Sequence, residues 1–422
     1  MILAGSLVAA DPAALLQRAR ERIIDNIDHI PNYTCVQAVS RQQFRQIGFM
    51  NRRPSCSAIL DERAQRTQSH LKLASVNRLR LDVALSEGHE IFSWAGDKKF
   101  ESEDVHQLVG GGMTGTGDFA AFTISIFASD SALYEFRGET KVGATTLAEY
   151  RYRVSRELSH YTMRGGSHLA TMAYAGTFWI DTGSSDLIRL TVQVDEPPPE
   201  SGICQVNSTM EYQRMPIGSE RFLLPRKSTL SMVDRGGDES LNTIEYSSCR
   251  AYSAESTLRF ESAAAASEGG SAITPPAMLP KTRRVSIKLS SIIDSRTAVA
   301  GDIVRGVLAK PIRDQNGQTL VPAGAPVVGR LTRMEERWVP SHCFAVGLRF
   351  DAVELNGHEI PLTLAALPVA GEVSDPRSQL RPRGSEIGLP PIERRPGVGS
   401  FLFGRKAPLI LGEKFQSEWE TR

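Results

Sequence analysis

The pattern of apolar and polar positions predicts a chain built mainly of short antiparallel strands. Residues 174–194 are the clearest example: Phe178 and Ile180 occupy alternate positions before a Gly-Ser-Ser turn, and Leu190 and Val192 do so after it. A period of two is typical of a strand with one buried face, and Gly and Ser are common in the turns that join such strands. We therefore predict a β-hairpin at this position.

Similar runs recur through the first 260 residues. Strands are predicted over 33–39, 78–85, 90–94, 133–140, 147–154, 161–164, 169–174, 204–214, 222–233 and 241–246. Leu16, Ala19, Ile23 and Ile27 recur at helical spacing after an Asp-Pro start, and shorter helices are predicted over 102–109 and 118–127. A long antiparallel meander with a few helices on one side indicates a mainly β, α+β fold with a strongly curved sheet or half-barrel.

A second, all-β region follows a stretch rich in Ala, Ser, Gly and Pro. Short strands separated by Asn-Gly and Pro-Ala-Gly turns predict a small β-barrel. The predicted organisation is a signal-peptide remnant over 1–10, a half-barrel over 11–261, a flexible linker over 262–279, and a barrel over 280–422 with a disordered insertion over 371–397.

Composition narrows the compartment and the classes of partner. The 422 residues carry a formal net charge of +1, which gives no overall field for nucleic acid, and we predict no nucleic-acid partner. Since no apolar run approaches the roughly 20 residues that a spanning helix needs, we predict no transmembrane segment. Residues 1–10 resemble the end of a secretory signal and predict a periplasmic or exported protein; an ordinary apolar lead-in to the first helix is the alternative.

The five cysteines support the same location. We predict two local disulfides, Cys35 with Cys56 and Cys204 with Cys249, while Cys343 stands alone. Five buried thiols in a cytosolic protein are the alternative. Neither Cys-x-x-Cys nor a metal-type histidine spacing occurs, so we predict no metal and no cofactor.

One string suggests catalysis. Asp181-Thr-Gly-Ser-Ser resembles the loop of pepsin-like aspartic proteases, in which two such loops bring two carboxyl groups together to activate water. The chain has no second copy of this loop. We therefore predict a non-enzymatic protein with a structural Asp181 turn, and an aspartic-type hydrolase that uses Asp181 is the less favoured alternative.

Residues 78–94 combine a strand, a Ser-Glu-Gly turn and an aromatic strand. Together with the Gly-Thr-Phe-Trp-Ile-Asp hairpin, they resemble the periplasmic lipoprotein-carrier (LolA/LolB-like) superfamily over residues 15–260. In that family, a curved antiparallel sheet wraps over helices and leaves an apolar hollow for acyl chains. The resemblance implies a hollow that binds a lipid, an acyl group or an apolar peptide. The candidate lining residues are Phe92, Trp94, Phe119, Phe122, Phe127 and Trp179, with ordinary core packing as the alternative for most of them.

The second region has its own resemblance. Residues 286–290, the Ala-Gly-Asp at 300–302, the Thr-Leu-Val-Pro-Ala-Gly at 319–324 and residues 357–362 are similar to the C-terminal β-barrel of the channel-forming component of type IV secretion and conjugation systems. That resemblance implies a scaffold barrel that docks an envelope protein. The whole chain is thus predicted to be an exported cell-envelope binding or scaffold protein; a purely structural assembly protein with a filled core is the alternative.

Overall fold

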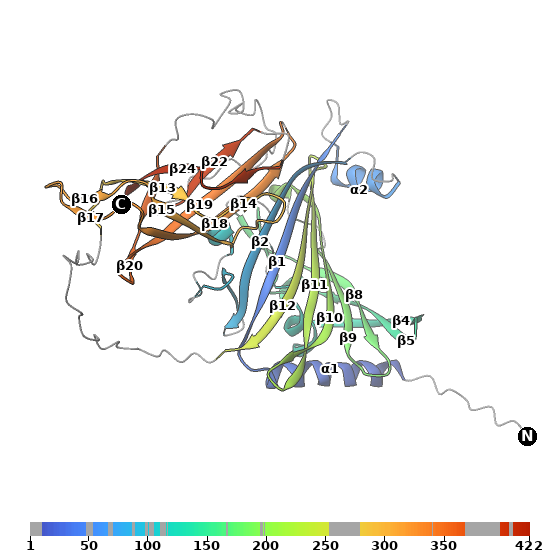
Figure 1. Cartoon of the computed structure of the whole chain (residues 1–422). Helices are drawn as coiled ribbons and strands as arrows, with labels where there is room; N and C mark the ends of the chain where they lie inside the picture. Colours follow the sequence, from blue (N-terminus) through green and yellow to red (C-terminus); the bar gives the residue numbers. More distant parts are fainter. Residues whose placement is uncertain are drawn as a thin grey trace, which may run out of the picture. The chain divides into compact units, whose positions relative to one another are not determined.

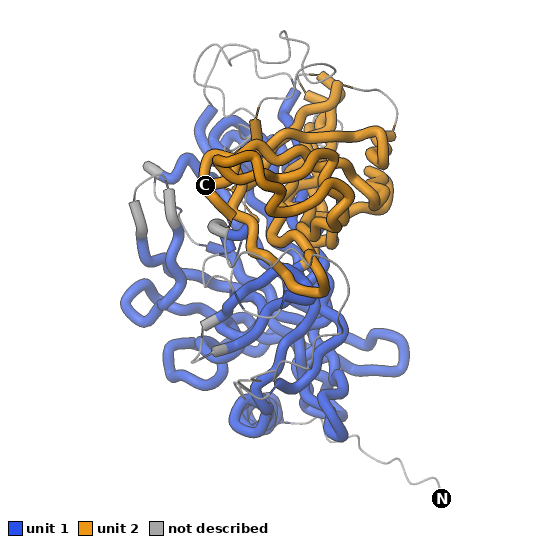
Figure 2. Tube along the Cα trace, turned by 60° about the vertical axis from the view of Figure 1, so that its left-hand side comes forward, with its two compact units in different colours: residues 1–73, 81–108, 113–252 blue, residues 74–80, 109–112, 253–422 orange. Residues whose placement is uncertain are grey.

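The computed structural model divides into two compact units, shown in Figures 1 and 2. The structure describes residues 11–47, 54–65, 71–86, 89–97, 100, 105–109, 115, 117–165, 168–194, 197, 199–252, 279–339, 341–367, 397–404 and 408–422. Unit 1 comprises Met1–Leu73, Leu81–Leu108 and Met113–Tyr252, and unit 2 comprises Ala74–Arg80, Val109–Gly112 and Ser253–Arg422.

Unit 1 is built on one curved antiparallel sheet (Figure 1). Its strands are paired in the order β4-β5-β8-β9-β10-β11-β12-β1-β2-β3. The strands are β1 (Tyr33–Gln46), β2 (Leu71–Ser86), β3 (His89–Trp94), β4 (Ala132–Val142), β5 (Thr145–Val154), β8 (Tyr174–Asp181), β9 (Leu187–Val194), β10 (Ile203–Ile217), β11 (Glu220–Asp234) and β12 (Glu239–Ala251). A separate small hairpin joins β6 (Thr162–Gly165) to β7 (His168–Thr171).

The predicted fold class, mainly β with a curved antiparallel sheet and helices, is confirmed. The hairpin predicted over 174–194 is formed by β8 and β9, with Phe178 opposite Leu190. Both of these side chains are fully buried, because alternate positions on the two strands face the same core. The second predicted hairpin is also present, with Leu81 of β2 opposite Trp94 of β3.

Helix α1 (Pro12–His29) covers this core from one side. Asp11 caps its first turn by accepting a hydrogen bond from the Ala13 amide at 3.1 Å, and the proline at the first helical position needs no such partner. Leu15, Ala19 and Ile23 are its buried face, at 0 to 3% exposed. The buried face of the helix therefore begins one residue earlier than predicted, because Leu15 rather than Leu16 is fully buried.

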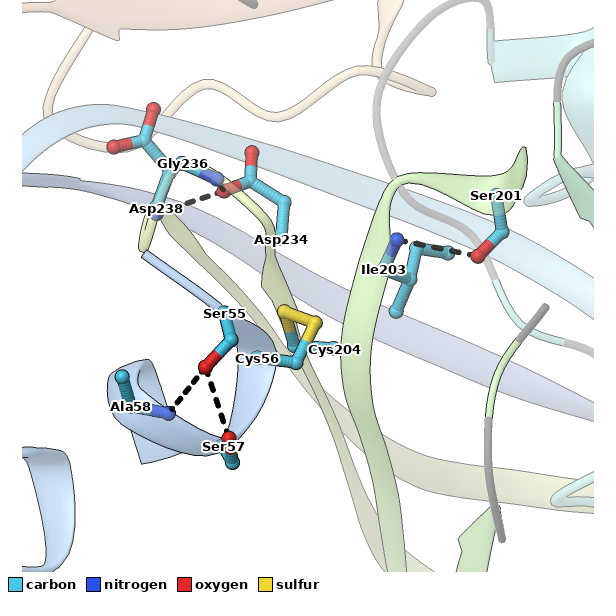
Figure 3. The surroundings of a disulfide bond; sticks show 10 residues. All are labelled: Ser55, Cys56, Ser57, Ala58, Ser201, Ile203, Cys204, Asp234, Gly236 and Asp238. Atoms are coloured by element: carbon cyan, nitrogen blue, oxygen red, sulfur yellow. Dashed lines mark hydrogen bonds between the residues drawn. A yellow bond between two sulfur atoms is a disulfide. The ribbon is translucent and has the colours of Figure 1, made fainter. Parts of the chain in front are cut away.

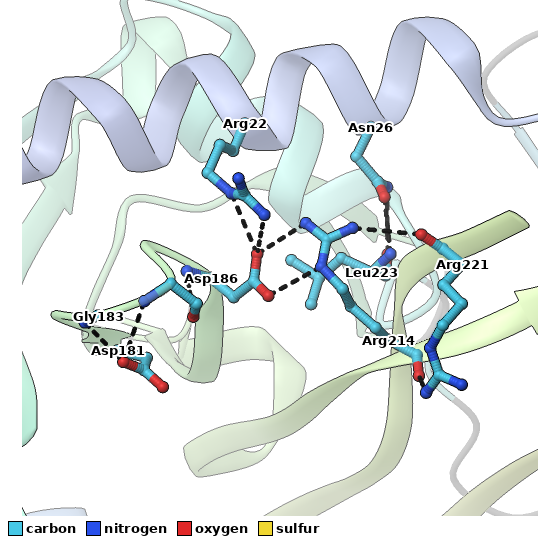
Figure 4. Close-up of polar contacts among 9 residues, drawn as sticks. Arg22, Asn26, Asp181, Gly183, Asp186, Arg214, Arg221 and Leu223 are labelled. Carbon is cyan, nitrogen blue, oxygen red and sulfur yellow. Dashed lines mark hydrogen bonds and ion pairs between the residues drawn. The ribbon is translucent and has the colours of Figure 1, made fainter. Parts of the chain in front are cut away.

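Polar side chains tie α1 to the sheet (Figure 4). Arg22 of α1 and Arg214 of β10 both donate to the carboxylate of Asp186, with Nη2 to Oδ1 distances of 3.2 and 2.7 Å. Asn26 pairs with the Leu223 backbone in both directions, at 3.2 Å and 2.6 Å. The Asp186 side chain is only 12% exposed; burial raises its pKa, but the two arginines outweigh burial and hold the pKa below its ordinary value.

Replacing this carboxylate should loosen α1. Asp186→Asn is expected to lower the free energy of unfolding by about 1 to 2 kcal/mol at neutral pH, because it leaves two partly buried guanidinium groups without a counter-charge. Hydrogen exchange of the α1 amides and a thermal melt would measure it. Asp130→Asn is the matched control, since Asp130 pairs with Arg20 but is fully exposed, and it should change less. Equal effects of the two variants would contradict this anchoring role.

The segment predicted as one helix over 118–127 is more irregular. It forms one short turn, α4 (Ala121–Thr123), followed by a π-helical turn, η1 (Ile124–Ala128). The wider turn puts residues five apart on one side, and Phe122 and Phe127 are both buried in the same core cluster. Of the helix predicted over 102–109, the structure describes α3 (Val105–Val109).

Two disulfides connect strands and helices that are distant in sequence. Cys35 is bonded to Cys249, and Cys56 is bonded to Cys204. The four predicted cysteines are therefore the right ones, but the predicted pairing of Cys35 with Cys56 and of Cys204 with Cys249 is wrong. Cys343 is a buried free thiol.

The strand order explains the pairing that forms. Strand β1 runs beside the last strand of the unit, β12, which places Cys35 next to Cys249 across the ladder. Cys56 begins helix α2 (Cys56–Gln65) and is bonded to Cys204 of β10 (Figure 3). Ile59 of the same helix packs with Cys204 and Val233. The cysteines that we predicted to pair thus lie on different elements: Cys35 on β1 and Cys56 on α2, and Cys204 on β10 and Cys249 on β12.

Unit 2 is also built of antiparallel strands and has its own core. Pairing joins β19 to β20 and to β22, and then runs from β19 through β18, β15, β13 and β24 to β21. These strands are β13 (Arg284–Leu289), β15 (Ile303–Leu308), β18 (Pro326–Arg337), β19 (Cys343–Leu355), β20 (His358–Pro361), β21 (Leu364–Ala366), β22 (Gly399–Phe403) and β24 (Gln416–Thr421). Two short ribbons complete it, namely β14 (Ile293–Asp294) with β23 (Ile410–Leu411), and β16 (Ile312–Arg313) with β17 (Thr319–Val321).

One segment of β2 belongs to unit 2 and not to unit 1. Ser75, Val76 and Asn77 pair with the end of β18. The signal remnant over 1–10 lies outside the described residues, and so do nearly all of the predicted linker over 262–279 and insertion over 371–397. Those assignments remain predictions.

Candidate functional site

Residues 117–128, which we call the insert segment, pack aromatic rings against the core face of the unit 1 sheet. The ring centroid of Phe122 lies 5.3 Å from that of Tyr161, and the ring centroid of Phe127 lies 5.0 Å from that of Phe178. Both rings meet their partners edge-on, the arrangement that aromatic pairs favour. A short, irregular piece of the chain therefore supplies part of the aromatic core.

A third phenylalanine of the insert segment lies between two tyrosines. The Phe119 ring centroid is 5.1 Å from that of Tyr33 on β1 and 5.5 Å from that of Tyr246 on β12. All three residues are at most 4% exposed. The insert segment thus reaches β1 and β12 through Phe119, and β8 through Phe127.

A carboxylate from β3 holds the start of the insert segment. Glu90 accepts hydrogen bonds from the backbone amides of Gly117, Phe119 and Ala120, at 2.9, 3.0 and 3.4 Å. Burial raises the pKa of Glu90, and these three amides oppose that rise by stabilising the charged form. Glu90 therefore fastens the segment through its backbone, independently of which side chains the segment carries.

A second carboxyl group lies on the segment itself. Asp118 is 5% exposed, and its Oδ2 atom has no hydrogen-bond partner among the described residues. Burial, the largest cause, raises the pKa of Asp118 to about 7; the nearby Ser228 hydroxyl lowers the pKa, and the charge of Glu90 raises it by a smaller amount. At neutral pH, this group lies close to the midpoint of its titration.

The residues around the two acids are polar but uncharged. Ser228 is 1% exposed, and its Oγ lies near Asp118 without meeting the geometry of a hydrogen bond to any described residue. Burial, and then the charges of the two acids, raise the pKa of Tyr212 and of Tyr246, so both phenols stay protonated. The arrangement can take up and release a proton in the buried interior of unit 1.

Three of the six predicted lining residues come together on the insert segment: Phe119, Phe122 and Phe127. Phe92 and Trp94 are each 1% exposed on β3, the strand that carries Glu90. Neither of their rings makes a recorded ring contact with the insert segment in the described part of the chain. Their role in a ligand site remains a prediction.

Trp179 is separate from this group. It alternates with the buried residues Phe178 and Ile180, so its side chain leaves the sheet on the opposite face. Its indole Nε1 donates to Glu149 at 3.2 Å, and the Arg189 guanidinium lies over its ring at 5.8 Å. The structure therefore does not bring Trp179 together with the three phenylalanines.

Asp181, the catalytic alternative, caps its own turn. Its Oδ1 accepts hydrogen bonds from the amides of Gly183 and Ser184, at 2.8 and 3.3 Å (Figure 4). This is the bonding pattern of an Asp that stabilises a turn. No described carboxyl group pairs with Asp181, and its geometry fits the predicted structural turn.

Neither acid of the site, Glu90 or Asp118, was among the residues predicted from the sequence. For Glu90 a signal was present, because it shares the alternation of Phe92 and Trp94 and therefore belongs to the same side of β3. Asp118 had no comparable signal, since an acidic residue at the start of a helical pattern is usually a solvated cap. Only the three-dimensional fold places its side chain in the core.

The described residues include no group of three or more His, Cys, Asp or Glu side chains placed to hold a metal ion. Likewise, none of the described helices is long and apolar enough to span a membrane.

The sequence matches no family model and no curated protein. Solved structures that match part of this chain include a LolA superfamily protein from Nitrosomonas europaea, at 9% identity and a TM-score of 0.26, over 58% of this chain and 95% of the other. A DUF1329 family protein from Desulfovibrio piger matches at 10% identity and a TM-score of 0.29, over 58% and 95% of the two chains. A lipoprotein-sorting protein domain described as putative, from Vibrio parahaemolyticus, matches at 9% identity and a TM-score of 0.27, over 56% and 92%. Scores this low carry no argument about function.

Proposed function

We propose that unit 1 is an exported binding module that takes up an apolar ligand, a lipid, an acyl group or an apolar peptide, on the face that the insert segment now covers. Unit 2 would then serve as the domain that docks an envelope partner. The proposal keeps the function predicted from the sequence and assigns its binding face to specific residues.

One observation carries the proposal: a short segment of the chain covers the aromatic core face of the sheet. The cover contains a π-helical turn, a distortion that is frequent at functional sites. It also brings the carboxyl group of Asp118 into the core beside Glu90 of β3, and a buried acid with an unpaired oxygen costs free energy that a purely structural core would avoid. Both features favour a segment that can move away from the sheet, and they disfavour one that fills the core permanently.

The two disulfides support the proposed location. Disulfides persist in oxidising compartments such as the periplasm and are rare in the cytosol. The structure therefore supports an exported protein independently of the residues at the start of the chain.

The competing function is that of an assembly protein whose core is permanently filled. In that case the insert segment never leaves the sheet, and Phe122 and Phe127 are ordinary core residues, at 5% and 0% exposed. The two functions differ in whether an apolar molecule can replace those rings.

Dye binding distinguishes these functions. Full-length protein purified from an oxidising compartment is titrated with N-phenyl-1-naphthylamine, and lysophosphatidylcholine or an apolar peptide is used to displace the dye. We expect saturable binding and complete displacement, with several-fold tighter dye binding by Phe122→Ala because that variant weakens the cover. Native mass spectrometry of the same preparation should find a co-purified lipid or peptide.

Phe350→Ala is the matched control. Phe350 is 1% exposed in the core of unit 2, so its loss creates a similar defect away from the proposed site. If both variants bind more dye to the same extent, the dye reports general loosening. That result, or the absence of saturable binding in the wild type, would favour the filled-core assembly protein.

A further inference from the structure

We propose that Glu90 and Asp118 form a proton-operated latch: the insert segment is held over the aromatic face while Asp118 is protonated, and it is released when Asp118 ionises. Only the effect of the latch on ligand binding rests on the proposed function. The closing and opening of the segment can be tested without any ligand.

The two acids lie on the two partners of one contact, the hydrogen bonds between Glu90 and the backbone of the insert segment. Glu90 comes from β3 and grips the amides of Gly117 and Phe119, whereas Asp118 lies between those two residues on the segment that is gripped. Fastening the segment therefore buries the Asp118 carboxyl group, which is 5% exposed, beside Glu90. Burial, and to a smaller extent the neighbouring charge of Glu90, then oppose the ionisation of Asp118.

No compensating cation reaches the pair from the described elements. The groups that face the two acids are the phenols of Tyr33 on β1, Tyr161 before β6, Tyr212 on β10 and Tyr246 on β12, together with the Ser228 hydroxyl on β11. The phenols have raised pKa values and do not titrate near neutrality. The two acids are thus the groups of this cluster whose charge can change: burial raises the pKa of both, and it raises that of Asp118 to about 7.

The sign of the linkage follows from the closed and open states. Burial raises the pKa of Asp118 from its ordinary 3.8 to about 7 in the closed state, whereas in an opened, solvated segment it should return toward the ordinary value. Opening therefore releases a proton between these two values. Raising the pH through this range favours the open state by up to tenfold per unit, and above the closed-state pKa the effect levels off.

A ligand that binds the exposed face should follow the same dependence. Its affinity should increase from pH 5.5 to pH 7.5, because a larger fraction of the protein has the segment released. Acidification would close the segment and expel the ligand. Release of cargo would thus be coupled to proton uptake at the buried carboxyl group of Asp118.

Hydrogen exchange of full-length protein without ligand tests the latch. After correction for the pH dependence of intrinsic exchange, the amides of the insert segment should lose tenfold to a hundredfold in protection between pH 5.5 and 7.5. Asp118→Asn should abolish this change and keep the segment protected at both pH values. Glu90→Gln retains an acceptor for the amides but removes the neighbouring charge, so it should reduce the change without abolishing it.

Asp234→Asn is the matched control for an acid in the same unit. Asp234 is 8% exposed, has a raised pKa because of burial, and accepts from the amides of Gly236 and Asp238 in a turn remote in sequence (Figure 3). It should leave the pH dependence of the insert segment unchanged. The latch would be overturned if the insert segment of the wild type were equally protected at both pH values, or if Asp118→Asn kept the pH dependence of the wild type. If Asp118→Asn does not fold, a wild-type pH dependence in Glu90→Gln would overturn it. If the latch holds but no dye binds, the proposed function alone fails.

Discussion

Replacing Cys35 and Cys249 together with serine is expected to lower the free energy of unfolding of unit 1 by roughly 4 kcal/mol, with measured values for comparable disulfides between about 2 and 5. The reason is the long connection that the bond closes, since the two cysteines are 214 positions apart. In the unfolded chain, the bond restricts all the strands between β1 and β12. We expect the thermal midpoint to fall by about 10 °C, which a calorimetric scan of the full-length protein would measure.

Single substitutions separate the two possible pairings. Cys35→Ser should leave the thiol of Cys249 free for alkylation under non-reducing conditions, while Cys56 stays bonded to Cys204. The pairing predicted from local spacing would instead free Cys56. Cys343→Ser should change neither result, because that thiol takes part in no disulfide. Recovery of a peptide that links Cys35 to Cys56 would contradict the strand order described above.

Asp118→Asn is expected to stabilise unit 1 at pH 8 and to change little near pH 4. The folded-state pKa of Asp118 is raised, so its favourable contribution is complete below its ordinary 3.8 and is lost as pH rises toward about 7. An asparagine resembles the protonated acid and has no such loss. With about 1.4 kcal/mol for each pKa unit, the gain at pH 8 should be on the order of 2 to 4 kcal/mol.

Thermal melts of both proteins from pH 4 to pH 8 would measure this difference. The comparison variant is Asp186→Asn, whose effect should have the opposite sign: the pKa of Asp186 is lowered, so its contribution is present at neutral pH and is lost in acid. An Asp118→Asn variant that is less stable at pH 8 would show that the ionised carboxylate makes favourable contacts. In that case, the electrostatic reason for the latch would be wrong.

Local pattern was sufficient for most of the fold. Alternation at β8 and β9 predicted a hairpin that is present, and helical spacing after Asp11 predicted α1 with its cap. These signals survive in the sequence because each strand or helix must turn one face to a core, whatever its neighbours are. The segment over 118–127 was harder, because apolar spacing does not separate an α-turn from a π-turn.

The candidate site was only partly predictable. Phe119, Phe122 and Phe127 were among the expected lining residues and do share the insert segment, whereas Trp179 lies on the other face of its strand. An aromatic residue in a sequence indicates burial, but it does not indicate which residues it packs against. The alternation of Trp179 with Phe178 already indicates the opposite face of the strand. The prediction instead followed the aromatic character of Trp179.

By itself, the sequence determined that this chain is mainly β, that α1 and the antiparallel hairpins form where they do, and which four cysteines are oxidised. Those properties depend on residues close together in the chain. Only the tertiary structure decided that Cys35 meets Cys249, and that Glu90 grips the segment on which Asp118 is buried. Such contacts depend on which strands become neighbours, and strand order is set by the burial of the whole sheet and not by local spacing.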